Sequence, residues 1–172
     1  MTTQSAPVVL VTGASRGIGR AIAELLLRDG YDLHATYASD AKAAEGLLGF
    51  AEQLGRRVTL HRYDAGSRDD QARLAEELQG VRLHGIVHNA GMIEFENFAA
   101  YEMTTWDRTL EVNVTSTLRL TLALQAQIES GGSIVLISST DAFSGAYASM
   151  AYAASKAAMV NLAKSLACNF GP

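Results

Sequence analysis

Short strand-like segments alternate with longer helix-like segments along this chain, and this alternation restricts its possible folds more than any other feature of the sequence. The strand-like segments, which hold the β-branched and aromatic residues that strands favour, are residues 7–12, 31–37, 57–63, 84–88 and 133–138. The helix-like segments are residues 20–29, 40–54, 67–79, 104–129 and 149–168. A chain of this kind builds a parallel sheet with right-handed crossovers and helices on both faces. We therefore predict an α/β, doubly wound parallel sheet in a single domain that spans residues 1–172.

Capping residues support the expected helix ends. A glycine, which commonly ends a helix, follows each of the first three helical segments, at Gly30, Gly55 and Gly80. Ser67 with Asp70 predicts a capping box at the start of the third helix, and Thr104 with Asp107 predicts another at the start of the fourth. Gly131-Gly132 is expected to close that fourth helix.

Composition and charge exclude several classes of protein. A net charge of −4 argues against nucleic acid as a partner. The single cysteine, Cys168, cannot form an internal disulfide, and the spacing of Cys and His predicts no metal site. Residues 1–6 lack the charge and the apolar core of a signal peptide, and no apolar run is long enough to span a membrane. We expect a cytoplasmic protein.

A glycine-rich loop follows the first strand. Gly13, Gly17 and Gly19 allow a tight turn, and the helix that begins there offers free N–H groups to an anion. Their spacing differs from the general G-x-G-x-x-G fingerprint, and a tight strand-to-helix turn can use glycine for geometry alone. Because the loop follows the first strand of an alternating chain, we favour nucleotide binding.

The end of the second strand indicates which dinucleotide would bind. An acidic residue there would bind the ribose 2′-hydroxyl of NAD, whereas a basic group would accommodate the 2′-phosphate of NADP. The strand ends at Tyr37 and is followed by Ala38 and Ser39, and the next acidic residue, Asp40, is better placed as a helix cap. Arg16 in the glycine loop could reach a phosphate. NADP (as NADPH) is therefore favoured and NAD is less favoured, although the position of Asp40 also fits the NAD rule.

Tyr152 and Lys156 lie four residues apart in the last helical segment, on one face and one turn from each other. Such a pair is common on ordinary amphipathic helices. A fixed ammonium group near a phenol nevertheless favours the phenolate, which would let Tyr152 transfer a proton near neutral pH.

Taken together, these motifs resemble the short-chain dehydrogenase/reductase family, and most closely its bacterial branch of 3-oxoacyl-acyl-carrier-protein reductases. The resemblance covers the whole chain, follows the family's order of motifs and implies a Rossmann-like sheet. It implies a catalytic set that consists of Asn113, Ser139, Tyr152 and Lys156. It also implies cofactor contacts from Gly13, Ser15, Arg16, Gly17, Ile18, Gly19, Tyr37, Asp64, Ala65, Asn89, Ala90, Gly91, Tyr152 and Lys156.

The same resemblance implies a role for each catalytic residue. Tyr152 would exchange a proton with the substrate oxygen, and Ser139 would hold and polarise the carbonyl group. Lys156 would activate Tyr152 and hold the nicotinamide ribose, and Asn113 would hold a water molecule that relays protons to Lys156. Taken singly, Ser139 could instead cap a strand end, Asn113 could serve helix packing, and Asp64 could be a turn residue.

The chain departs from the family pattern at two places. His88 stands where the family usually has an asparagine, so the local hydrogen bonds must differ. Family members continue beyond the point that corresponds to Pro172, into further strands and a substrate-covering loop, and the fifth strand here is expected to be an exposed sheet edge. A fragment of a complete enzyme is favoured over a short protein that completes its sheet through a partner.

The predicted activity is oxidation or reduction between a nicotinamide cofactor and a carbonyl or secondary alcohol. The resemblance implies a small-molecule or acyl-thioester substrate, such as a 3-oxoacyl thioester, which would place the enzyme in fatty acid or polyketide metabolism. An inactive nucleotide-binding or regulatory module is one alternative, and an epimerase or dehydratase of the same superfamily is another. Family members commonly form homotetramers or dimers through the two long helices, residues 104–129 and 149–168.

Overall fold

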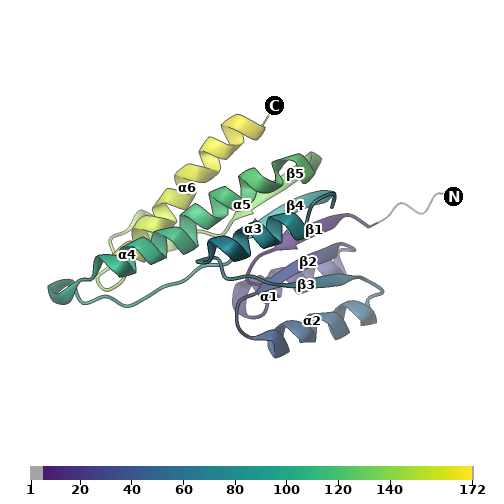
Figure 1. Ribbon diagram of the computed structural model, residues 1–172, viewed down its shortest axis with the longest axis horizontal. Coiled ribbons are helices and arrows are strands. Elements are labelled where there is room, and N and C mark those ends of the chain that lie inside the picture. Colours follow the sequence, from purple (N-terminus) through teal and green to yellow (C-terminus); the bar gives the residue numbers. More distant parts are fainter. Residues whose placement is uncertain (1–5, 172) are drawn as a thin grey trace.

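The computed structural model describes residues 6–171 and confirms the predicted α/β, doubly wound fold (Figure 1). Its strands are β1 (Val8–Val11), β2 (Asp32–Tyr37), β3 (Val58–Arg62), β4 (Leu83–His88) and β5 (Ile128–Leu136). Its α-helices are α1 (Gly17–Arg28), α2 (Ala41–Gln53), α3 (Arg68–Glu77), α4 (Met103–Leu110), α5 (Ser116–Leu124) and α6 (Met150–Phe170). The strands are parallel and lie in the order β3-β2-β1-β4-β5.

Two apolar cores cover the two faces of the sheet. On one face, side chains of β1 and β2 such as Val11 and Ala35 pack with Leu27 of α1 and Leu47 of α2. On the other face, Leu10 of β1 packs with side chains from α3 and α5. This arrangement follows from the strand period of two, because successive side chains of β1 point to opposite faces. α6 packs along α4 (Figure 1).

Most of the expected helix ends are confirmed. The Ser67 hydroxyl accepts a hydrogen bond from the Asp70 amide (3.2 Å), and the Asp40 carboxylate accepts one from the Ala43 amide (2.9 Å). The three glycines that follow the first helices have positive φ, which side-chain-bearing residues rarely adopt: Gly30, Gly55 and Gly80.

The predicted single helix over residues 104–129 was wrong. It is divided into α4, a π-helical segment η2 (Glu111–Thr115), α5 and a short 3₁₀ segment (Gln125–Gln127). α4 begins at Met103 with Glu102 at its N-cap and without a side-chain cap bond, so Thr104 does not cap it. Gly131-Gly132 does not close the helix either, because both glycines lie within β5. β5 starts early because Ile128 pairs with Leu83 and packs against the core, a long-range contact that outweighs the local pattern.

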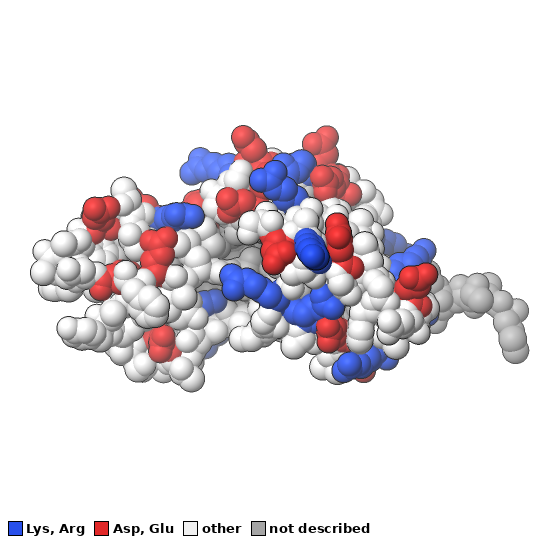
Figure 2. Space-filling view, turned by 90° about the horizontal axis from the view of Figure 1, so that it is seen from below, with Lys and Arg blue, Asp and Glu red and all other residues white. Residues whose placement is uncertain are grey.

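Acidic and basic side chains of the described residues are interspersed on the face shown in Figure 2. No helix within residues 6–171 is both long and apolar enough to cross a membrane.

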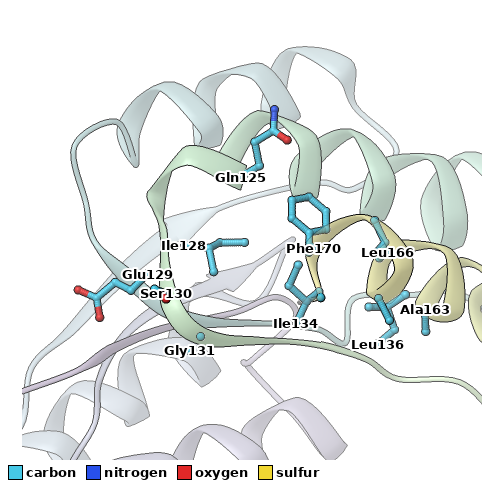
Figure 3. A pocket seen from close by; sticks show the side chains of 13 residues that line it. Gln125, Ile128, Glu129, Ser130, Gly131, Ile134, Leu136, Ala163, Leu166 and Phe170 are labelled. Atoms are coloured by element: carbon cyan, nitrogen blue, oxygen red, sulfur yellow. The ribbon is translucent and has the colours of Figure 1, made fainter.

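β5 lies at the end of the sheet order, which confirms the predicted edge position. Between β5 and α6 lies an open groove of about 720 Å³. Ile134 and Leu136 of β5 face Leu166 and Phe170 of α6 across it (Figure 3). The lining is mainly apolar, with Gln125, Glu129 and Ser130 at one end, and it contains none of the predicted catalytic or cofactor-binding residues.

Candidate active site

The predicted phosphate loop lies between β1 and α1, at the carboxyl end of the sheet. Gly13 and Gly17 have φ of 67° and 58°, a region that glycine occupies without strain. A Cβ atom added at Gly19 would stand 2.3 Å from the Gly13 carbonyl oxygen. Glycine is therefore required at these positions for backbone conformation and for close packing.

Hydrogen bonds join this loop to the end of β4. The Thr12 hydroxyl accepts from the backbone amides of Asn89 and Ala90, both at 3.0 Å. The Asn89 side-chain amide donates to the carbonyl oxygens of Thr12 and Gly13, again at 3.0 Å. These contacts fix the glycine loop against the predicted Asn89-Ala90-Gly91 motif. Sequence reasoning did not select Thr12 as a site residue, although it ends the first strand-like segment directly before the glycine-rich loop.

A groove of about 380 Å³ runs across the carboxyl ends of the strands. The predicted cofactor residues that line it are Gly13, Ser15, Arg16, Gly17, Asp64, Ala65, Asn89, Ala90 and Gly91. Asp40, which the sequence offered as the residue that fits the NAD rule, also lines the groove. Lining residues that the sequence did not indicate as cofactor contacts are Ala38, Ser39, Tyr63, Met92, Arg108 and Val112. Of the remaining predicted contacts, Gly19 is buried by packing, while Ile18, Tyr37, Tyr152 and Lys156 lie outside the lining.

The donors and acceptors of this groove fit a dinucleotide. Free helix N–H groups and a glycine loop at one end suit a pyrophosphate. Arg16, Ser39 and Asp40 all line the groove, and residues at the end of the second strand are the ones that contact the adenosine ribose of a bound dinucleotide. Asp40 is the N-cap of α2, as predicted, and its side chain also lines the groove. Asp64 accepts a hydrogen bond from the Gly66 amide (2.9 Å), so it serves the turn and the groove together.

Tyr152 and Lys156 lie side by side on the first turns of α6. The Lys156 ammonium is 5.6 Å from the centroid of the Tyr152 ring and donates to the Ile137 carbonyl oxygen at 2.7 Å. Lys156 is only 5% exposed, and this burial lowers the pKa of its ammonium group from the ordinary value. A Cβ atom added at Gly91 would lie 3.5 Å from that ammonium group. The glycine-lined groove and the Tyr152–Lys156 pair therefore meet at Gly91.

Asn113 lies in the π-helical segment η2 and is almost completely buried. Its side-chain oxygen accepts from the Met92 amide (2.8 Å), and its side-chain nitrogen donates to the Met92 carbonyl oxygen (2.9 Å) and to the Ser155 hydroxyl (2.9 Å). Ser155 in turn donates to the Tyr152 carbonyl oxygen at 2.7 Å. Asn113 thus joins the segment after β4 to α6. Ser155, which sequence reasoning did not select, completes this link from inside the Tyr152–Lys156 motif.

Ser139 follows β5, and its hydroxyl accepts a hydrogen bond from the Asp141 amide at 3.2 Å. It therefore caps the short 3₁₀ segment Thr140–Phe143, whereas the alternative considered from the sequence was a cap at a strand end. The neighbouring Ser138 hydroxyl donates to the Lys156 carbonyl oxygen (2.8 Å) and ties this loop to α6. Binding of a substrate carbonyl by Ser139 stays a prediction.

His88 is buried at the end of β4, directly before Asn89. Its Nε2 atom lies 2.8 Å from the Thr121 hydroxyl, and that hydroxyl donates to the Thr117 carbonyl oxygen at 2.8 Å. Burial lowers the pKa of His88 to about 4, which keeps the ring neutral at pH 7. The departure from asparagine is therefore accommodated by a neutral imidazole that bonds to α5.

Comparison with known proteins agrees with these features. The family described as short chain dehydrogenase matches residues 7–172. The 3-oxoacyl-acyl-carrier-protein reductase FabG of Aggregatibacter actinomycetemcomitans is 31% identical over 164 residues, which cover 92% of this chain and 68% of that protein. Nodulation protein G of Rhizobium sp. strain N33 is 37% identical over 166 residues, covering 92% and 64%. A short chain dehydrogenase from Burkholderia cenocepacia, solved in complex with NADP, superimposes with a TM-score of 0.86 at 36% identity and covers 96% of this chain and 69% of its own. The chain thus spans about two thirds of the length of these relatives.

Proposed function

The chain belongs to the short-chain dehydrogenase/reductase family, and we propose that it is an NADP-dependent oxidoreductase acting on a carbonyl or secondary alcohol. The observation that carries this proposal is the meeting of two sites. The glycine-lined groove reaches Gly91, and the Lys156 ammonium and Asn113 lie next to Gly91, with Tyr152 on the same helix face as Lys156.

Residues of the groove would form a binding site for a nicotinamide dinucleotide. Ser15, Arg16 and Gly17 would hold the phosphates, Asp64 would bind at the adenine end, and Gly91 leaves room at the catalytic end. When bound, the cofactor supplies or accepts the hydride, and the protein supplies orientation and proton transfer.

Tyr152 would donate a proton to the carbonyl oxygen as the alcohol forms and would take it back in the reverse direction. The nearby Lys156 ammonium stabilises the negative charge that is left on the phenol oxygen. Ser139 would hold the carbonyl oxygen through its hydroxyl group. Asn113 would act mainly by fixing Met92 and Ser155, while its predicted water-holding role stays a prediction.

NADP is proposed as the preferred cofactor because Arg16 lines the same groove as Ser39 and Asp40, and because a related structure contains NADP. The test is a fluorescence titration with NADPH and NADH. We expect R16A to weaken NADPH binding about tenfold, through loss of a charge-assisted phosphate contact, while NADH binding stays nearly constant. R28A, at the far end of α1 from Arg16 and packed over the Phe50 ring, is the matched control. Equal losses for both cofactors in R16A would contradict the proposed phosphate contact.

The substrate is proposed to be an apolar carbonyl compound, and a 3-oxoacyl thioester is one candidate because a related reductase is named for that class. Phe143 and Tyr147, between β5 and α6, are strongly exposed and supply apolar surface near the start of α6. Consumption of NADPH with small ketones and with 3-oxoacyl thioesters tests this assignment. Y152F should abolish turnover and leave NADPH binding intact, whereas wild-type protein that binds NADPH without consuming it would favour a regulatory module.

Self-association through α5 and α6 is proposed as well. Leu118 and Leu122 on α5 and Met150 on α6 expose apolar side chains. Light scattering after size exclusion would distinguish a dimer or tetramer from a monomer.

A further inference from the structure

The helix that carries Tyr152 begins without a cap of its own. Ser149 occupies the N-cap position of α6, but its side chain makes no cap hydrogen bond. The first N–H groups of a helix have no partner inside the helix, so they need an acceptor from elsewhere. Tyr152 is in this first turn, and its position depends on how the turn is held.

Glu96, from the segment after β4, supplies that acceptor. One carboxylate oxygen accepts from the Met150 amide at 2.7 Å, and the other accepts from the Ala151 amide at 3.0 Å. The Glu96 backbone amide also donates to the Ala148 carbonyl oxygen at 2.8 Å. A carboxylate at this position satisfies two helix N–H groups and complements the positive end of the helix dipole.

The same segment is fixed at its other end by the candidate catalytic set. Asn113 forms two hydrogen bonds with the backbone of Met92, and Asn113 also bonds to Ser155 of α6. Residues 92–96 are therefore attached at both ends, to Asn113 and to the first turn of α6. This places the segment as a brace between the cofactor groove and Tyr152.

We propose that Glu96 is a positioning residue that sets the location of the Tyr152 phenol through its bidentate cap on α6. The proposal rests on the proposed function of Tyr152, but it concerns the geometry of the helix start and can be measured separately. Glu96 lies 54 residues before Met150, so the cap exists only in the folded protein.

The test compares E96A and E96Q with E102A in the full chain. Glu102 is an exposed glutamate at the N-cap position of α4, close in sequence to Glu96. Its carboxylate forms no cap hydrogen bond, which makes it a matched control. In E96A, amide exchange at Met150 and Ala151 should become about tenfold faster, as expected for loss of a helix cap. E96Q keeps one acceptor oxygen and should lie between E96A and wild type, while E102A should match wild type.

A ring-carbon NMR signal of Tyr152, assigned by its absence in Y152F, reports the phenol directly. We expect this signal to shift or broaden in E96A and to stay unchanged in E102A. If wild-type protein turns over a carbonyl substrate, kcat should fall in E96A with little change in the KM for NADPH. An unchanged Tyr152 signal in E96A would overturn the proposal even if amide exchange increased. A wild-type protein without turnover would count against the proposed function, and the NMR signal would still decide the role of Glu96.

Discussion

Replacement of His88 by asparagine should make the protein less sensitive to acid. His88 is buried with its ring neutral, and burial lowers its pKa from 6.5 to about 4. In the unfolded chain the ring is exposed and binds a proton below its ordinary pKa. Between these two values the unfolded state binds a proton that the folded state excludes, so the free energy of unfolding falls as the pH drops from about 6.5 to about 4.

The size of this effect follows from the two pKa values. Linkage gives a loss of about 2 kcal/mol on going from roughly pH 7.5 to roughly pH 5, and about 3 kcal/mol when the whole window is crossed. Above about pH 6.5 the ring is neutral in both the folded and the unfolded state, so His88 no longer changes the free energy of unfolding with pH. H88N lacks this titration, because an amide stays neutral across this pH range.

Urea unfolding of wild type and H88N, followed by far-UV circular dichroism at both pH values, measures the difference. H88N is expected to be less stable at neutral pH, because the smaller side chain leaves space in the core, but it should lose about 2 kcal/mol less on acidification. Other histidines remain in both proteins and cancel in the comparison. Equal acid losses in the two proteins would refute the reasoning.

Two further changes probe the contacts that join the site. T12V removes the acceptor of the Asn89 and Ala90 amides and should cost about 1–3 kcal/mol of unfolding free energy, while T12S should retain most of it; equal stability of the two variants in urea would contradict the role of the hydroxyl. G91A places a methyl group 3.2 Å from the Asn113 side-chain oxygen and 3.5 Å from the Lys156 ammonium, and should weaken NADPH binding about tenfold in a fluorescence titration. G145A is the control, because an added Cβ there meets no atom within 4 Å, and it should bind NADPH like wild type. Wild-type binding of NADPH by G91A would contradict the proposal that the cofactor extends to Gly91.

Local signals were enough for much of the fold. The alternation of strands and helices predicted the parallel sheet, and Ser67 and Asp40 cap the helices that they were expected to cap. Gly30 has the positive φ expected of a glycine at a helix end. These features depend on residues a few positions apart, so they can be predicted from the local sequence. The four-residue spacing of Tyr152 and Lys156 is of the same kind, since helix geometry alone brings the two side chains together.

Features that depend on distant residues could not be read from the sequence. The bonds of Asn89 to Thr12 cross 77 positions, and those of Glu96 to the start of α6 cross more than 50. The fourth helix changes to a π-helical segment at Asn113, where the side chain bonds to Met92 and Ser155. The helix and strand propensities of these residues do not indicate which distant groups they will bond to. The sequence by itself determined the parallel sheet and the glycine-rich turn, and it indicated the candidate catalytic residues. Only the tertiary structure decided which neighbours hold those residues in place, because the hydrogen bonds that do so form only after distant segments have packed together.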